Sequence, residues 1–196
     1  MNDDPQPLDN LRTLLDADWR QLSNFAGSPA VRRKLSSNFS PRFMPVVILR
    51  IAQRLHVRGW PRIAKMFSLL NFLLFGLEAP ARLSIGPGLV LPHTVGTILG
   101  ARSIGANVTI YQQVTLGAKV ADYDYVPEVR PLVEDGALIT AGAKIIGPVT
   151  IGRGSVVGAN AVVLEDVPPL HMAVGVPAAV KPLGSYTALR AKEAGL

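Results

Sequence analysis

The chain contains no cysteine among its 196 residues. A disulfide framework, a thiolate metal site and a cysteine nucleophile are therefore excluded. Histidine is also scarce, because only His56, His93 and His171 are present. Any histidine-dependent chemistry must therefore use one of these three residues.

The chain also lacks the run of about 20 apolar residues that would span a bilayer. Its most apolar stretch, 66–77, lies between Lys65 and Glu78 and is too short. We expect this stretch to pack against neighbouring elements or a partner subunit. Peripheral contact with a membrane is a second interpretation, because basic and apolar residues occur together there. The first ten residues are acidic and polar, unlike a secretory signal, so we expect a cytoplasmic protein.

Basic residues outnumber acidic ones, with 20 Lys and Arg against 14 Asp and Glu. Many of them lie in the first third of the chain, at Arg32, Arg33, Lys34, Arg42, Arg50, Arg54, Arg58, Arg62 and Lys65. No helix-turn-helix, zinc-finger or aromatic RNA-binding motif accompanies them, so we expect no nucleic-acid partner. A solvated basic surface fits this pattern best.

Three segments of the first third are predicted to be helices. Residues 8–26 place leucines and Trp19 at helical spacing. Pro45 fits the start of a helix that extends to about 57, and Pro61 the start of one that extends to about 77.

The second half of the chain has a six-residue period. Its aliphatic positions are Val133, Ile139, Ile145, Ile151, Val157 and Val163. A small or β-branched residue follows each of them four positions later, at Ala137, Ala143, Val149, Ser155, Ala161 and Val167. This period indicates a hexapeptide β-solenoid, in which each repeat forms one flat side of a prism and its aliphatic residue points inward. A valine-rich β-sandwich is the alternative, but sandwiches do not hold one register over so many repeats.

An earlier run has the same period, at Ile85, Leu91, Ile98, Ile104, Ile110 and Leu116. One extra residue lies between Leu91 and Ile98, and His93 falls in this interruption. The register breaks again before Val133. We expect the polar segment 118–132 to be a loop extruded from the prism.

Several ordered segments support a more specific assignment. They are Phe-Gly-Leu-Glu-Ala-Pro at 75–80, Leu-Pro-His-Thr-Val-Gly at 91–96, Tyr-Gln-Gln-Val-Thr-Leu-Gly at 111–117, Ala-Gly-Ala-Lys-Ile-Ile-Gly-Pro-Val-Thr-Ile-Gly at 141–152, Val-Pro-Pro at 167–169 and Gly-Val-Pro-Ala at 175–178. Together they resemble the serine acetyltransferase branch of the hexapeptide-repeat acyltransferases, with a shortened amino-terminal domain.

This resemblance implies a mainly β protein, a left-handed parallel β-helix preceded by a small α-helical region. It implies an α-helical region at 1–78, a β-helix acyltransferase domain at 79–183 and a tail at 184–196. Acetyl-CoA would bind as co-substrate between subunits of a homotrimer. A hexamer would result if the helices paired two trimers.

Acetyl transfer to a hydroxyl group requires a base for the alcohol proton. Histidine suits this role because its pKa lies near neutral pH. His93 corresponds to the catalytic histidine of the family, and Glu78 to an acidic residue that would orient it or contact the acceptor. A turn histidine and a surface carboxylate are the alternatives. We expect His56 at a surface or interface and His171 in a structural role.

The expected acceptor-binding residues are Gln112, Gln113 and Arg130. The glutamines also fit the polar face of a coil, and Arg130 also fits a solvated loop charge. The family's serine enzymes have Asp where this chain has Pro92, and an Arg-His pair where it has Val129 and Arg130. These departures favour a sugar or another small hydroxyl acceptor, with L-serine and cysteine biosynthesis as the alternative.

The expected cofactor-binding residues fall into two groups. By resemblance, small residues that expose the backbone to pantetheine are Gly117, Ala141 and Ala159. Candidates for the adenosine phosphates are Lys144, Arg153 and Lys181, each of which also fits an exposed charge.

Two other functional classes are known for prisms of this kind or fit a β-helix without catalysis. A prism-type carbonic anhydrase would need three histidine zinc ligands, but only His93 lies within the coils, so we expect no metal. A non-catalytic β-helix scaffold would not need His93 together with the cofactor segment.

Overall fold

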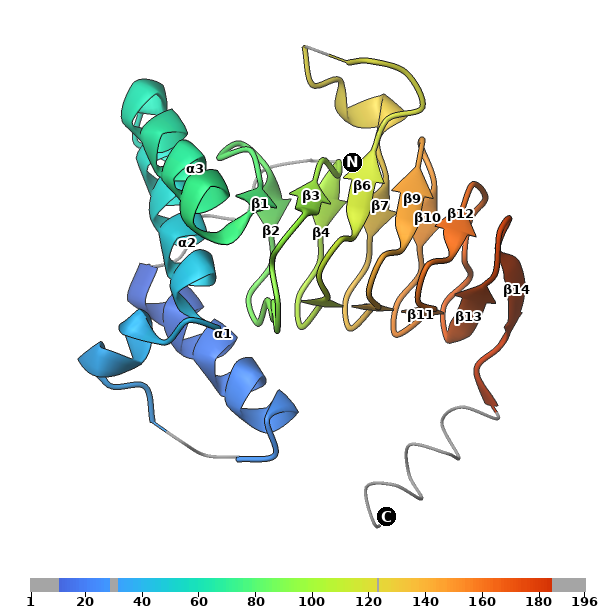
Figure 1. Ribbon diagram of the computed structural model, residues 1–196, viewed down its shortest axis with the longest axis horizontal. Coiled ribbons are helices and arrows are strands. Elements are labelled where there is room, and N and C mark those ends of the chain that lie inside the picture. The colour runs from blue at the N-terminus through green and yellow to red at the C-terminus, as the bar shows by residue number, and fades with distance from the viewer. Residues whose placement is uncertain (1–10, 29–31, 123, 185–196) are drawn as a thin grey trace, which may run out of the picture.

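The computed structural model describes residues 11–28, 32–122 and 124–184. A group of helices precedes a column of short strands (Figure 1). The helices are α1 (Leu11–Phe25), η1 (Leu35–Phe39), α2 (Met44–Val57) and α3 (Pro61–Phe75). The three predicted helices are thus confirmed within the described residues, whereas almost all of the predicted tail lies outside them. No helix of the described part is both long and apolar enough to cross a membrane.

Local sequence explains where the second and third helices begin and end. Pro45 and Pro61 lie in the first turns of α2 and α3, where proline lacks only a hydrogen bond that the helix would not make. Gly76 ends α3 in the left-handed conformation, with φ of 62°. A Cβ atom at Gly76 would lie 3.2 Å from the backbone of both Val95 and Gly96, so this entry into the coils favours glycine.

The strands form three sheets, which are the flat sides of a prism. Their bounds are β1 (Leu77–Glu78), β2 (Ser84–Ile85), β3 (Thr97–Leu99), β4 (Ser103–Ile104), β5 (Thr109–Ile110), β6 (Thr115–Gly117), β7 (Leu132–Val133), β8 (Leu138–Ile139), β9 (Lys144–Ile146), β10 (Thr150–Ile151), β11 (Val156–Val157), β12 (Val162–Val163), β13 (His171–Val174) and β14 (Ala179–Pro182). Sheet A has the order β1-β3-β6-β9-β12, sheet B β10-β7-β4-β2 and sheet C β14-β13-β11-β8-β5. All pairs are parallel except the final β13–β14 pair. The predicted parallel β-helix is therefore confirmed.

The core lies inside the prism and consists of the aliphatic residues of the repeat. All twelve residues that the second half of the chain assigns to its two repeat positions are buried. One assignment in the first half is wrong, because Ile98 faces outward and is 37 % exposed. Leu99 is buried instead and pairs with Leu116. The extra residue before β3 thus shifts the inward position by one, as alternation along a strand requires.

The loop between β6 and β7 projects from the edge of the prism and is the large excursion at the top of Figure 1. It contains one 3₁₀ turn, η2 (Pro127–Val129). The Tyr125 hydroxyl group donates a hydrogen bond to the Ala101 carbonyl oxygen at 2.6 Å. The loop is therefore held against the preceding coil.

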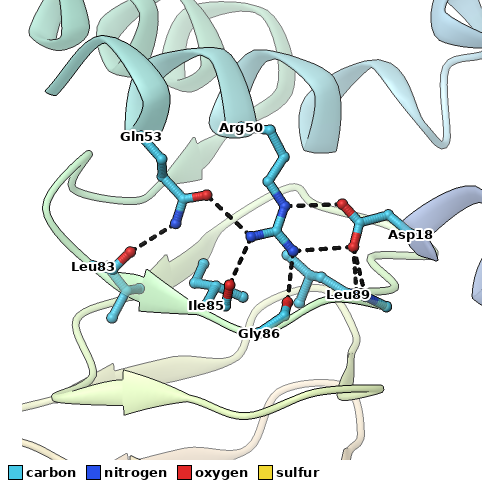
Figure 2. Close-up of polar contacts among 8 residues, drawn as sticks. Asp18, Arg50, Gln53, Leu83, Ile85, Gly86 and Leu89 are labelled. Carbon is cyan, nitrogen blue, oxygen red and sulfur yellow. Dashed lines mark hydrogen bonds and ion pairs between the residues drawn. The ribbon is translucent and has the colours of Figure 1, made fainter. Parts of the chain in front are cut away.

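A buried ion pair fixes the helices to the first coil (Figure 2). Arg50 of α2 donates to both carboxylate oxygens of Asp18 in α1, at 2.9 and 3.0 Å, and both side chains are 0 % exposed. Arg50 also donates to the carbonyl oxygens of Ile85 and Gly86, at 2.8 and 2.6 Å. Asp18 in turn accepts from the backbone N–H of Leu89 at 2.8 Å. Two helices and a coil are thus joined through one charged pair.

Candidate functional site

His93 lies on the edge where sheet C passes into sheet A, just before β3. The neighbouring Thr94 hydroxyl group donates to the Phe75 carbonyl oxygen at 2.9 Å, and the Gly96 N–H donates to the Gly76 carbonyl oxygen at 3.0 Å. These bonds fix the backbone of the turn. The His93 side chain is exposed and has no hydrogen bond within the described residues. Its imidazole is therefore free to meet a ligand.

The same edge carries several other predicted residues on successive coils. Backbone N–H groups link the turns along it, from Gln113 to Val95 at 3.1 Å, from Gly142 to Gln112 at 3.0 Å and from Asn160 to Ala141 at 2.9 Å. Ala159 lies in the last of these turns and is exposed. The structure therefore brings His93, both glutamines and the two alanines onto one edge.

This edge has features that fit acetyl-CoA. Ala141 and Ala159 have side chains too small to cover the backbone. The Oε1 atom of Gln112 is buried and has no hydrogen-bond partner among the described residues. A buried acceptor without a partner is uncommon in native proteins, and an amide N–H of pantetheine would satisfy it. The Gln113 carbonyl oxygen is already occupied, because the Lys144 ammonium group donates to it.

A second feature is an open cleft of about 770 Å³ between α3, sheet A and the extruded loop. Glu78 projects into it from the end of β1 and is exposed. The Glu78 carboxylate has no ion pair or hydrogen bond within the described part of the chain. Lys65 and Arg82 also line the cleft. A free carboxylate and two cations together suit a small zwitterionic ligand.

Glu78 and His93 are not paired within one chain. They lie on neighbouring coils, because Glu78 pairs in register with Ile98, which follows the His93 turn. No hydrogen bond between their side chains occurs among the described residues, and His93 is absent from the residues that line the cleft.

Arg130 lies in the cleft wall, but its nitrogens are engaged by its own chain. Nε donates to the Asp122 carboxylate at 2.9 Å, Nη1 to the Gly100 carbonyl oxygen at 3.0 Å and Nη2 to the Asp122 carbonyl oxygen at 3.1 Å. The guanidinium group stacks over the Tyr125 ring at 3.8 Å, and the side chain is 10 % exposed. Arg130 therefore anchors the loop, and its role as an acceptor ligand stays a prediction.

Sequence reasoning missed the partners of Arg130 in the loop, Asp122 and Tyr125. Burial raises the pKa of the Tyr125 hydroxyl to about 12, although the positive charges of Arg130 and Arg82 act in the opposite direction. The phenol is therefore neutral at ordinary pH. Aromatic and acidic residues around 122–125 were the available signal, because such side chains commonly surround a half-buried arginine.

The remaining predicted cofactor residues are spread over the prism. Gly117 lines the cleft, and Lys144 lies on sheet A. Arg153 lies on a different edge, between sheets B and C, where it forms an ion pair with Asp135 at 3.7 Å. Lys181 is exposed on β14. Within one chain the structure does not bring Arg153 together with the edge that carries His93.

The two other histidines differ in position. His56 belongs to α2 and lines the cleft. The His171 Nδ1 atom lies 2.9 Å from the Pro169 carbonyl oxygen, consistent with a structural role. Within the described residues, no three His, Asp or Glu side chains form a group that could hold a metal ion.

Comparison with known proteins places this geometry in a family. Residues 130–165 match the family "Bacterial transferase hexapeptide (six repeats)". A serine acetyltransferase of Helicobacter pylori is 35 % identical over 164 residues, which cover 83 % of this chain and 94 % of that protein. One of Bacillus subtilis is 37 % identical over 132 residues, covering 67 % of this chain but only 59 % of that protein.

A solved serine acetyltransferase in complex with CoA is similar in structure. Its TM-score is 0.76 at 26 % identity, covering 87 % of this chain and 69 % of that one. The β-helix is therefore of the left-handed kind. The chain spans about three fifths of the Bacillus relative's length. By its sequence and its structure, the chain belongs to the serine acetyltransferase family of hexapeptide-repeat acyltransferases.

Proposed function

We propose that this protein is an acetyl-CoA-dependent O-acetyltransferase with His93 as its general base. The observation that carries the proposal is the exposed, unbonded imidazole of His93 on the edge that also holds Gln112, Ala141 and Ala159. The family's serine acetyltransferases, including the one solved with CoA, support the same chemistry.

The acceptor that we propose is L-serine. The sequence favoured a sugar for two reasons: Pro92 cannot accept a hydrogen bond from the ammonium group of serine, and a cationic Arg130 would repel that group. The Arg130 charge is instead neutralised by the adjacent Asp122 carboxylate, 2.8 Å away, which removes the second reason. The exposed carboxylate of Glu78 can hold an ammonium group, and Lys65 or Arg82 a carboxylate. The relatives are serine acetyltransferases, which favours serine over a sugar.

Each residue of the proposed site has a defined role. Acetyl-CoA supplies an acetyl group activated as a thioester. His93 accepts the proton of the acceptor hydroxyl as its oxygen forms the new ester bond. It then returns this proton to the sulfur when the carbon–sulfur bond breaks. Glu78 holds the acceptor, and Gln112 together with the backbone at Ala141 and Ala159 holds pantetheine.

We also propose that the active protein is a homotrimer, with a hexamer as the larger alternative. Support comes from His93 and Glu78, which are exposed and unpaired within one chain. A site between subunits would bring His93 of one chain toward the cleft of the next. Light scattering of the purified protein should give three or six times the mass of one chain, and an active monomer would contradict this proposal.

The catalytic proposal is tested by His93→Ala. We expect kcat for L-serine to fall by about 10²–10⁴, since that is the usual contribution of a general base. Binding of CoA, measured by calorimetry, should change little. His171→Ala is the matched control and should retain activity. Activity of His93→Ala within tenfold of an active unmodified protein would refute the assignment. Absence of CoA release by the unmodified protein would instead favour the non-catalytic scaffold.

A further inference from the structure

Helix α3 has an apolar face that nothing in the described chain covers. Its cleft side carries Lys65 and Phe72, and its inner side is held to α2 by Asn71, whose side-chain nitrogen donates to the Pro45 carbonyl oxygen at 2.9 Å. The outward face consists of Ile63, Met66, Leu70, Leu73 and Leu74, which follow three- and four-residue spacing.

This outward face is strongly exposed for an apolar surface. Met66 is 67 % exposed, Leu73 69 % and Leu74 58 %. Trp60, in the turn before α3, is 57 % exposed. Soluble proteins rarely leave such a continuous apolar patch without a partner.

Cations predominate in the segment of the chain that contains α3. From Trp19 to Leu77 the chain has no Asp or Glu, but it carries ten of the 20 Lys and Arg residues. The coils from Glu78 to Leu183 carry seven basic and eight acidic residues and are nearly neutral. Arg58 and Arg62 are exposed beside Trp60, at the start of the apolar face. Two exposed cations therefore lie beside the exposed apolar face, whereas Arg33 and Arg50 are paired with Asp16 and Asp18 of α1.

This combination distinguishes between two occupants of the face. If two copies met through this face, Arg58 and Arg62 of one copy would approach those of the other, and α3 has no carboxylate of its own to balance them. An anionic lipid surface has the opposite charge and also takes up apolar side chains and tryptophan at its interface. Charge complementarity therefore favours lipid.

We propose that the outward face of α3 docks the protein on an anionic membrane surface. The apolar side chains enter the boundary between headgroups and acyl chains, while Arg58 and Arg62 lie among the anionic headgroups. The helix lies in the plane of the surface and does not span the bilayer. Because the other side of α3 forms part of the cleft wall, docking places the cleft beside the membrane.

Co-sedimentation of the full chain with lipid vesicles tests this proposal. We expect binding to vesicles of equal parts phosphatidylglycerol and phosphatidylcholine, little binding to pure phosphatidylcholine, and loss of binding at high salt. Met66→Gln/Leu73→Gln should weaken binding about tenfold or more, since it removes two of the most exposed apolar side chains. Arg62→Gln should weaken it about fivefold, through the loss of one cation near the surface.

Matched variants on the coils provide the controls. Leu164→Gln/Leu170→Gln changes two exposed leucines and Arg102→Gln one exposed arginine, and neither should affect vesicle binding. Circular dichroism should show the same thermal unfolding for all variants. Acetyl transfer to soluble L-serine should be unchanged in Met66→Gln/Leu73→Gln, so failure of this proposal is distinct from failure of the proposed function.

Two results would overturn the proposal. One is equal vesicle binding by the unmodified protein and by Met66→Gln/Leu73→Gln. The other is that the unmodified protein does not bind anionic vesicles and that Met66→Gln/Leu73→Gln has a lower particle mass than the unmodified protein in light scattering. The second result would show that another copy of the chain covers the face.

Discussion

At the scale of single residues, Arg130 links the loop after β6 to the preceding coil. The guanidinium group bonds to Asp122 and to the Gly100 carbonyl oxygen of the preceding coil, and it covers the Tyr125 ring. The loop therefore has a charged, almost fully buried centre. Its geometry, and the cleft wall that it forms, should respond to changes at this one position.

Replacing Arg130 with Gln should destabilise the protein. The change leaves Asp122, which is 8 % exposed, as a buried carboxylate without its partner. We expect the free energy of unfolding to fall by about 3 kcal/mol, as for other broken buried pairs. Urea denaturation measures this loss, with Arg102→Gln as an exposed control. A loss no greater than that of the control would show that the cluster does not stabilise the fold.

Tyr125 should make the free energy of unfolding fall at high pH. Its pKa is raised from the ordinary 10.0 to about 12, chiefly by burial. Because the folded chain favours the neutral phenol, the stabilisation is complete below pH 10.0 and is lost as the pH rises toward 12. Unfolding free energies across this range should fall less steeply in Tyr125→Phe. Identical slopes for both proteins would contradict the prediction.

At the scale of elements, the helices and the coils act as one unit because of the Asp18–Arg50 pair. It joins α1 and α2 to the backbone after β2, and hydrogen bonds satisfy both charges (Figure 2). A buried pair of this kind need not add net stability, but removing one partner leaves an uncompensated charge.

Arg50→Met should therefore be strongly destabilising, by about 3–5 kcal/mol. Arg33→Met is the matched control, because Arg33 also bonds to an aspartate of α1, Asp16, in a pair that is only partly buried, with side chains 12 % and 43 % exposed. Solvent reaches the Asp16 carboxylate, so we expect a smaller loss, nearer the value of about 1 kcal/mol or less for exposed pairs. Thermal or urea unfolding of both variants tests the contrast, and equal losses would contradict the view that Arg50 ties the helices to the coils.

The sequence predicted the elements well wherever a local repeat determines burial. Val133 and Ile139 could be assigned to the core because each coil repeats the same inward position. The sequence did not predict that Leu99 points inward in place of Ile98, because an inserted residue can be accommodated on either side of a turn. The Asp18–Arg50 contact could not be predicted either, since its residues are 32 positions apart and belong to no repeat.

For a related reason, the sequence could predict the positions of site residues on the coils but not the contacts made in the loop. Coil neighbours are 18 positions apart, as the pairing of Val156 with Leu138 shows. Ala141 and Ala159 have this separation and share an edge, whereas Arg153 is twelve positions after Ala141 and lies on another. The 18-residue repeat therefore already predicts that Arg153 lies on a different edge from Ala141. The bonds of Arg130 depend on how the irregular loop folds, which no period describes.

At the scale of the whole molecule, the excess of positive charge and the proposed catalytic edge lie in different regions. The coils are nearly neutral and carry His93 and the edge proposed for acetyl-CoA, whereas the helical region is basic and exposes the outward face of α3. The cleft lies between the two regions, with walls from α3, sheet A and the loop. The proposed acceptor site thus lies where the helices meet the coils.

The most direct test of the central claim is kcat/KM for L-serine and for glucose, measured as CoA release at saturating acetyl-CoA. We predict a value for L-serine of about 10⁴ M⁻¹s⁻¹ or more, within the ordinary range for an enzyme and its own substrate. The value for glucose should be at least about 100-fold lower, because a sugar leaves the Glu78 carboxylate without an ammonium partner. A higher kcat/KM for glucose than for L-serine would contradict the account.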